Sequence, residues 1–478
     1  MAAAATTTTQ TEEHVSLKLL LNENGNKVLF AEAGKDFVDI LCSFLTMPLG
    51  TIARLVQKES SIGPVTVGCL NSLYKSVADM DQGCFSTDVI QQMLLQPINS
   101  AEDYCNTLKH NIDDSQPVKF FVCDNYNSCC CPGMTIPTYK DKHKCHCGKP
   151  FTLPVFFKHC CQGFVNTDAT FVITDNLTVR PNSIDYTSFS LLQEFGINSP
   201  NSVKEVVVSV PKEKVLDLLK CSLLSESTLT HLFLGKKPPL GSSRLFSFNV
   251  EISHNNIEII LKLVIRKSDG KVLYAQGEQN FANLLLSFLT YPLGGVTRIF
   301  GECCYLGSIN GLYKSVADLN ENKYLISKHA KNRLVTPCIA PQIKLSKQIL
   351  PIFEPGVHDY YGYQEGNSNI IHAQFLKPGE NRNLNRINFS KAASPGESYV
   401  KDPAMYVATD DLVVSPLSPI SSLSLLNRLK TPLNDLKEIV VTIGAKECLS
   451  ILKAALTSKS ALTNGLAHLL TEVKEETS

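Results

Sequence analysis

Hydrophobic residues recur along the chain in two nearly identical orders. Residues 27–50 have the sequence KVLFAEAGKDFVDILCSFLTMPLG and residues 271–294 have KVLYAQGEQNFANLLLSFLTYPLG, with more than half of the aligned positions identical. In both copies apolar residues fall at i, i+3, i+4, i+7 and i+8, the spacing of one helix face. They are Phe37, Ile40, Leu41, Phe44 and Leu45 in the first copy, and Phe281, Leu284, Leu285, Phe288 and Leu289 in the second. The pattern predicts a buried helix in each copy, which ends or kinks at Pro48 and Pro292 because proline lacks a backbone donor.

A β-hairpin is predicted immediately before each helix. Residues 16–33 place two strand-type runs around Asn24-Gly25, and residues 261–277 place two around Asp269-Gly270. Asn-Gly and Asp-Gly favour the type I′ turns whose twist matches paired strands.

Further matches follow in the same order. The string LYKSVAD occurs at 73–79 and 312–318 and predicts a further helix in each copy. A strand, an Asp and a second strand are predicted in TFVITDNLTVRPNS from Thr170 and in MYVATDDLVVSPLS from Met405. Asp175 and Asp410 lie at the turns there, where an Asx-turn is the expected role. The runs VKEVVVSV and LKEIVVTI predict largely buried strands, each followed by a last helix.

The order of these elements predicts an α+β fold made of two tandem homologous domains. We expect a disordered tail at 1–13, a first repeat at 14–234 with a cysteine-rich insert at 123–161, and a linker at 235–244. The second repeat is expected at 245–470, with an irregular loop insert at 346–400, and a tail at 471–478. Each insert lies at the centre of its repeat, where the two copies no longer match.

Composition and charge exclude several classes of protein. Lys and Arg total 45 and Asp and Glu total 45, so no overall charge attracts the chain to nucleic acid or to an anionic membrane. The N-terminal residues lack the basic and apolar regions of a secretory signal. Two long uncharged runs, 40–53 and 279–297, contain Pro-Leu-Gly and fit core helices as well as they fit a membrane span. We expect an intracellular protein of the cytoplasm or the nucleus, without a membrane span.

The cysteines carry the candidate chemistry. The chain has 17 cysteines, and a reducing compartment favours metal ligands, buried thiols or reactive thiols over disulfides. Two nearby pairs, Cys123 with Cys129 and Cys145 with Cys147, can supply the four ligands of a tetrahedral zinc site. Four other residues remain alternatives as ligands: Cys130 or Cys131 in place of Cys129, and His143 or His146 in place of a thiolate.

Three other interpretations of this segment compete with zinc binding. The cysteines can be ordinary thiols, or His159 beside Cys160 can act as a nucleophilic pair, although no orienting partner is identifiable. Four lysines, Lys140, Lys142, Lys144 and Lys149, surround the second pair and fit a solvated loop better than a nucleic-acid surface.

Outside this segment, Arg54 and Arg298 are expected to be solvated or paired with a carboxylate.

The chain resembles the plant proteins grouped as domain of unknown function 674. The resemblance lies in residues 27–55, in GCLNSLYKSVAD, in CHCGK and in FVITDNLTVRPNS. It covers nearly all of the first copy and, without the CxCG element, most of the second. It implies a C…C…CxCGK element, which supports Cys123, Cys129, Cys145 and Cys147 as the ligand set, while Cys130 and Cys131 keep the second ligand open. It implies no activity and no catalytic residue.

The sequence therefore predicts a non-enzymatic protein with a structural zinc loop in its first repeat. Its binding function, with a protein as the favoured partner, is expected on the divergent inserts, because loops on a repeated scaffold carry function. The alternative is an enzyme or a zinc-dependent nucleic-acid binder that uses the cleft between the repeats. Phosphate-binding glycine loops and the common hydrolase and kinase motifs are absent from the sequence.

Overall fold

The computed structural model describes most of the chain outside the two inserts and the linker. The described residues are 14–22, 24–115, 119–123, 134–136, 144–145, 147–157, 162–182, 188–236, 258–301, 306–346, 350, 360–365, 369–372, 385–389, 398–402 and 404–475. They combine helices with mainly antiparallel sheets, so the predicted α+β class is confirmed. The expected tail at 1–13 lies outside the described residues. The expected tail at 471–478 is wrong for residues 471–475, which continue the last helix, and residues 476–478 lie outside the described residues.

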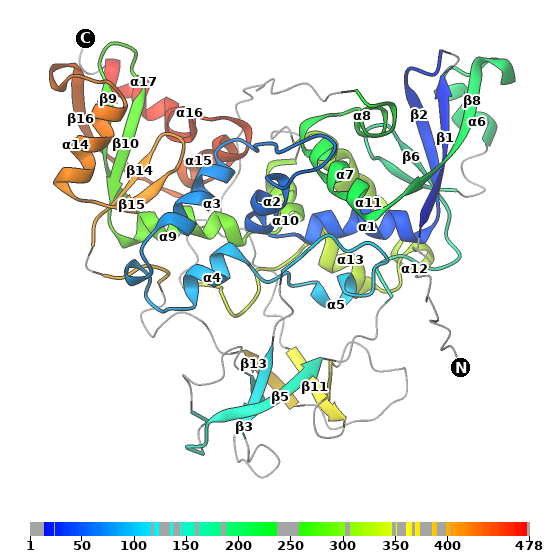
Figure 1. The fold of residues 1–478 in the computed structure, drawn as a ribbon, viewed down its shortest axis with the longest axis horizontal. Coiled ribbons are helices and arrows are strands. Elements are labelled where there is room, and N and C mark those ends of the chain that lie inside the picture. The colour runs from blue at the N-terminus through cyan, green and yellow to red at the C-terminus, as the bar shows by residue number, and fades with distance from the viewer. Residues whose placement is uncertain are drawn as a thin grey trace, which may run out of the picture.

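Two five-stranded antiparallel sheets lie at opposite ends of the molecule (Figure 1). The first has the order β7-β6-β2-β1-β8 and the second the order β15-β14-β10-β9-β16. The first sheet comprises β1 (Val15–Asn22), β2 (Val28–Ala33), β6 (Phe171–Thr174), β7 (Val179–Pro181) and β8 (Val203–Val210). The second comprises β9 (Ile259–Arg266), β10 (Val272–Gly277), β14 (Tyr406–Thr409), β15 (Val414–Pro416) and β16 (Leu436–Ile443). Both predicted hairpins are confirmed as β1–β2 and β9–β10, but the turns are not of type I′, because Gly25 and Gly270 have a positive φ whereas Asn24 and Asp269 do not.

The strands β8 and β16 differ from the expectation that they are largely buried. Both form, but each lies at the edge of its sheet and alternates between the core and an open outer face. Val207 and Val440 on that outer face are 63% and 67% exposed. Their runs of β-branched residues gave no alternation, so the sequence pattern could not distinguish an edge strand from a central one.

Most of the helices lie between the two sheets, whereas α6 (Ser188–Glu194) and α14 (Pro419–Arg428) lie on the outer sides of the first and the second sheet (Figure 1). Those from the first part of the chain are α1 (Lys35–Thr46), α2 (Leu49–Val56), α3 (Leu70–Asp79), α4 (Ile90–Leu95), α5 (Glu102–Cys105), α6 (Ser188–Glu194), α7 (Lys212–Leu224) and α8 (Thr228–Leu234). The later ones are α9 (Gln279–Ser287), α10 (Leu293–Phe300), α11 (Ile309–Asp318), α12 (Glu321–Tyr324), α13 (Lys328–Val335), α14 (Pro419–Arg428), α15 (Ala445–Thr457), α16 (Ala461–Gly465) and α17 (Ala467–Glu475). Short 3-10 turns are also present, among them η3 (Phe288–Thr290), which continues α9.

The predicted apolar stripes form the centre of the core. All ten stripe residues of α1, α9 and η3 are fully buried, and they belong to one hydrophobic cluster that extends over both halves of the chain. Pro48 and Pro292 separate the first two helices of each half, as expected, and stand immediately before α2 and α10. None of the described helices has the length and hydrophobicity that crossing a membrane requires.

The two inserts together form a third sheet, below the other two in Figure 1. Its strands are β3 (Phe120–Cys123), β4 (Met134–Ile136), β5 (Phe151–Phe157), β11 (Tyr360–Glu365), β12 (Asn369–His372) and β13 (Asn385–Phe389), in the order β3-β5-β12-β11-β13-β4. Strand β5 pairs in parallel with β12, and β4 pairs in parallel with β13. The expectation of an irregular loop at 346–400 is therefore wrong for β11, β12 and β13. Two of these strands find partners in the other insert, which no local sequence pattern could indicate.

The turn aspartates have a role other than the predicted Asx-turn. The carboxylate of Asp175 accepts hydrogen bonds from the backbone N–H and the hydroxyl of Thr230, both 2.8 Å long. Asp410 accepts from the backbone N–H of Thr463 at 2.8 Å. The two side chains therefore anchor α8 and α16 to the sheets, and the prediction of an Asx-turn was wrong because these partners lie about fifty residues away.

In each half, two side chains of the first helix form hydrogen bonds with the backbone where the chain returns from the insert. We call this set of hydrogen bonds the clasp. Asp39 Oδ1 accepts the backbone N–H groups of Phe164 and Val165, at 2.7 and 3.0 Å, and Lys35 bonds both Asp39 and the Gln162 carbonyl. Burial raises the pKa of Asp39 to about 6, against the opposing effect of the Lys35 ammonium. This first clasp is therefore ionisable near neutral pH.

The second half has a neutral version of this clasp at the matching positions. Asn283 Oδ1 accepts the backbone N–H of Tyr399 at 2.9 Å, and Gln279 Nε2 donates to the Val400 carbonyl at 2.9 Å. Asn283 thus shows that an amide can replace the carboxylate without loss of the acceptor.

We expect the substitution Asp39→Asn to remove a pH dependence of stability. Asp39 keeps its proton to about pH 6 in the fold but loses it near pH 4 when unfolded, so the folded state binds more protons between these values. The contribution of Asp39 therefore falls as the pH rises from 4 to 7, by on the order of 3 kcal/mol. Urea unfolding from pH 5 to 7.5 should show wild type gaining stability relative to Asp39→Asn as the pH falls. Parallel pH profiles would contradict the assignment.

Candidate metal centre

The pairing of β3 with β5 brings the cysteines of the first insert together. The two strands are antiparallel, and Cys123 at the end of β3 lies opposite Phe151 at the start of β5. A bulge falls between Val122 and Cys123, where the register shifts. The residues that lead into β5 must therefore pass beside Cys123, and these residues include Cys145 and Cys147.

A tight turn carries Cys145 and Cys147. The Cys145 N–H donates to the Lys149 carbonyl at 2.9 Å, and the Gly148 N–H donates to the Cys145 carbonyl at 2.8 Å. Gly148 has a φ of +79°, in the left-handed region that favours glycine. The turn closes with an isolated bridge between Lys144 and Pro150. The sequence CxCGK thus folds into a small loop with both thiols on it.

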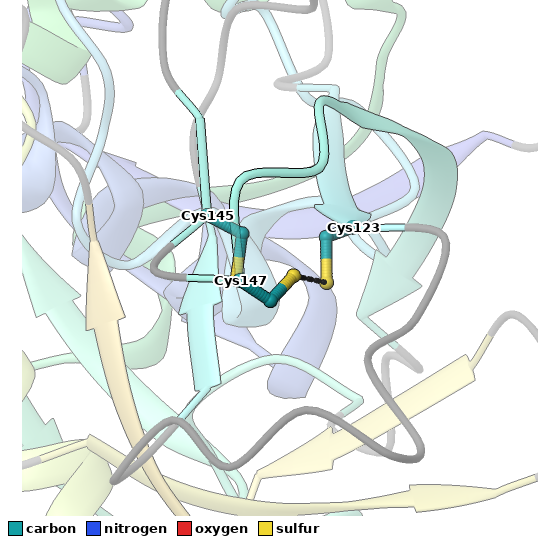
Figure 2. A group of neighbouring side chains, drawn as sticks. All are labelled: Cys123, Cys145 and Cys147. Atoms are coloured by element: carbon teal, nitrogen blue, oxygen red, sulfur yellow. Dashed lines mark hydrogen bonds between the residues drawn. The ribbon is translucent and has the colours of Figure 1, made fainter.

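The three sulfur atoms converge, as Figure 2 shows. All three Sγ atoms lie within 4.8 Å of one another, and those of Cys123 and Cys147 are 4.0 Å apart. A tetrahedral zinc ion with Zn–S bonds of 2.3 Å places its sulfurs about 3.8 Å apart. The three sulfur atoms would therefore move by about an ångström or less to occupy three corners of such a tetrahedron.

The environment of the three thiols is apolar on one side and open on the other. Cys123 is buried with Phe121 and Phe151, Cys145 packs partly buried against them, and Cys147 is exposed. A site at the end of a strand pair, with one wall formed by aromatic rings, can accept an ion from solvent and shield it on the inner side.

The structure brings together three of the four predicted ligands. Cys129 lies outside the described residues, as do the alternatives Cys130, Cys131, His143 and His146 and the pair His159 and Cys160. Lys144 and Lys149 are exposed beside the thiols, whereas Lys140 and Lys142 also lie outside the described residues. Which residue completes the tetrahedron therefore stays a prediction.

Several cysteines elsewhere in the described part of the chain have the properties of core residues. Burial raises the pKa of Cys69, Cys221 and Cys448 to about 12, so these thiols stay protonated at neutral pH. A protonated thiol is a poor nucleophile and a poor metal ligand. Among the described residues, three cysteines converge only at the first insert.

The pairing predicted for Arg54 is confirmed, and one feature was missed. Arg54 forms ion pairs with Asp113 and Asp114. A cavity of about 250 Å³ lies on the outer face of the first sheet beside α6, with Lys18 and Glu205 among its lining residues. The matching Lys262 and Glu438 of the second sheet form an ion pair at 3.2 Å. The matching sequences gave no sign that the two outer faces differ at this place.

Comparison with known proteins gives one match. A family model described as "Protein of unknown function (DUF674)" matches residues 11–446. No curated protein and no solved structure matches the chain.

Proposed function

The chain belongs to the DUF674 family, and because that family is described only as being of unknown function, we propose a function from the geometry. We infer a non-enzymatic binding protein in which a structural zinc ion fixes the sheet shared by the two inserts. Cys123, Cys145 and Cys147 are three of its ligands, and Cys129 is the proposed fourth. The observation that carries the proposal is the convergence of the three sulfur atoms.

The ligand chemistry favours zinc in a structural site. Thiolates are soft ligands that select zinc, copper(I) or iron–sulfur clusters over calcium and magnesium. Four protein ligands close the coordination sphere, whereas a catalytic zinc keeps one position open for water. A set of four cysteines therefore supports a structural rather than a catalytic ion.

The position of the thiols supports a role in holding the third sheet. They lie where β3 and β5 meet, and β5 pairs with β12 from the second insert. Metal binding to such a loop contributes directly to its folding free energy. An ion bound here would thus stabilise both inserts, although only the first insert supplies ligands.

Two buried charged groups support a non-enzymatic function. The Asp39 carboxylate is occupied by two backbone N–H groups and Lys35. The Lys220 ammonium donates to the carbonyls of Lys58 and Gly63, each at 2.6 Å, and to the Ser60 hydroxyl at 2.7 Å. Groups so fully satisfied serve the fold and have no capacity left for a substrate.

The repeated scaffold and the divergent inserts support a binding role with a protein partner. The same strand order in the two five-stranded sheets supports tandem duplication, with repeats at 14–234 and 245–470. The third sheet, built from the divergent inserts, is then the proposed binding surface.

We further propose an intracellular plant protein of the cytoplasm or nucleus. Salt-sensitive retention on immobilised nucleic acid, lost in Lys144→Ala and Lys149→Ala variants, would favour the alternative.

Elemental analysis tests the metal site. We expect about one zinc ion per chain in protein purified without chelator, and less than about 0.2 in Cys145→Ser or Cys147→Ser variants. Cys84→Ser is a matched control, because Cys84 is a partly exposed thiol that is not one of the three converging cysteines, and it should keep its zinc. Wild-type protein with less than about 0.2 zinc per chain would refute the site.

A further inference from the structure

The two halves of the chain meet in a contact that is the same from either side. The Leu49 N–H donates to the Tyr291 carbonyl, and the Leu293 N–H donates to the Met47 carbonyl, both at 2.9 Å. Pro48 and Pro292, between these residues, form an antiparallel bridge with each other. Each partner in one half occupies the matching position in the other half, which is the property of a twofold interface.

A second pair of contacts repeats this symmetry farther out. The Cys69 N–H, just before α3, donates to Ala455 on α15 at 2.7 Å. The Ser308 N–H, just before α11, donates to Ser222 on α7 at 2.8 Å. The helix α3 then packs on β15 of the second sheet, and α11 packs on β7 of the first. Each half thus contributes a helix to the sheet of the other.

A third set of contacts joins each half to the base of the opposite insert. Residues 84–86 form a two-bond ladder with residues 399–401, and residues 324–326 form one with residues 164–166. The four bonds are Ser86 N–H to Tyr399 O, Lys401 N–H to Cys84 O, Ile326 N–H to Phe164 O, and Asn166 N–H to Tyr324 O, at 2.9–3.0 Å. Contacts between the two halves therefore extend from the central helices to the bases of the inserts that form the third sheet.

We propose that one repeat is an obligate pairing module whose binding partner is a second copy of the same repeat. Helix α3 of the first half packs on the second sheet, and helix α11 of the second half packs on the first. Because one hydrophobic cluster extends over both halves, a single repeat would expose the apolar faces of its first two helices. In this chain the pair forms within one polypeptide, and a separate chain with one repeat of this kind would pair with its own copy.

The tether explains why both copies lie in one chain. A covalent link gives each half a high effective concentration of its partner, so the pair forms without competing encounters between chains. The pairing is also the condition for the third sheet, because β5 and β12 come from different halves. The shared sheet is thus a product of the pairing of the two halves.

Cutting the linker in the folded protein tests the proposal. Residues 238–243 of the full chain are replaced by a recognition site for a specific protease, and the purified protein is cut under native conditions. We expect two fragments on a denaturing gel but one particle of unchanged mass in light scattering. Two separate monomeric halves, each with its own unfolding transition, would overturn the proposal.

A glycine at the twofold contact provides the matched comparison. An added Cβ at Gly294 would lie 2.9 Å from the carbonyl oxygens of Leu45 and Leu334, whereas one at Gly34 meets nothing within 4 Å. In the cut protein, Gly294→Ala should raise the dissociation constant of the halves at least about tenfold, because the backbones cannot approach as closely. Gly34→Ala should leave it unchanged. Equal dissociation constants for the two variants would show that this contact does not hold the halves together.

Discussion

Alanine in place of Gly307 is expected to lower the free energy of unfolding by about 2–4 kcal/mol. The added Cβ would lie 2.3 Å from the Ser222 carbonyl oxygen, far inside van der Waals contact, and the backbone φ of +54° disfavours any side chain. Gly68 has the same environment in the other half, with a φ of +48° and the Ala455 oxygen at 2.3 Å. The two substitutions should therefore have similar effects, although they lie in different repeats.

The substitution Gly235→Ala separates the cost of the positive φ from the cost of the steric clash. Gly235 has a φ of +65° at the end of α8, but an added Cβ meets nothing within 4 Å. Gly235→Ala should therefore lose only the conformational cost, about 1 kcal/mol. Urea unfolding of the three variants gives the comparison. If Gly307→Ala lost no more than Gly235→Ala, the close approach between the halves would be able to relax without cost.

The elements that recur in both halves show how far the sequence predicts the fold. Periodicity and turn residues predicted the hairpins and the buried helices, because these depend on residues close together in the chain. The string LYKSVAD predicted that α3 and α11 bury an apolar face, but it carries no information on which sheet covers that face. Each of these helices packs on the sheet of the other half. The sequence could not predict this, because the two sheets have matching sequences and either one could cover the helix.

The inserts show a similar division. The turn with Cys145 and Cys147 depends on local sequence alone, because two cysteines and Gly148 follow one another closely in the chain. Cys123 joins them only because β3 pairs with β5, and β12 and β13 pair with β5 and β4, which lie more than two hundred residues earlier in the sequence. Three adjacent cysteines, Cys129 to Cys131, offer the same ligand at nearly the same distance along the chain. The spacing therefore left the fourth ligand open.

Removal of the proposed zinc ion is expected to unfold the third sheet in both inserts and to leave the two five-stranded sheets intact. Three of the proposed ligands lie on β3 and on the loop before β5, and β12 pairs with β5 at Asn369 and Ile370. Structural zinc contributes about 10–16 kcal/mol to small zinc domains, more than a short β-pairing can replace. Without the ion, β5 loses its anchored edge and β12 loses its partner.

Hydrogen exchange measures this coupling. Amides of β5 and of β12 should lose nearly all protection in Cys147→Ser, or in wild type after chelation, while those of β1 and β9 keep theirs. Cys84→Ser should match wild type at all four strands, since its thiol lies apart from the three converging sulfurs. Loss confined to β5 would mean that the second insert folds by itself and that the ion acts on one repeat only. Loss at β5 and β12 together, with β1 and β9 unchanged, requires that a ligand set in one insert stabilises the other. That result follows from the pairing of β5 with β12, because the ligands themselves do not reach the second insert.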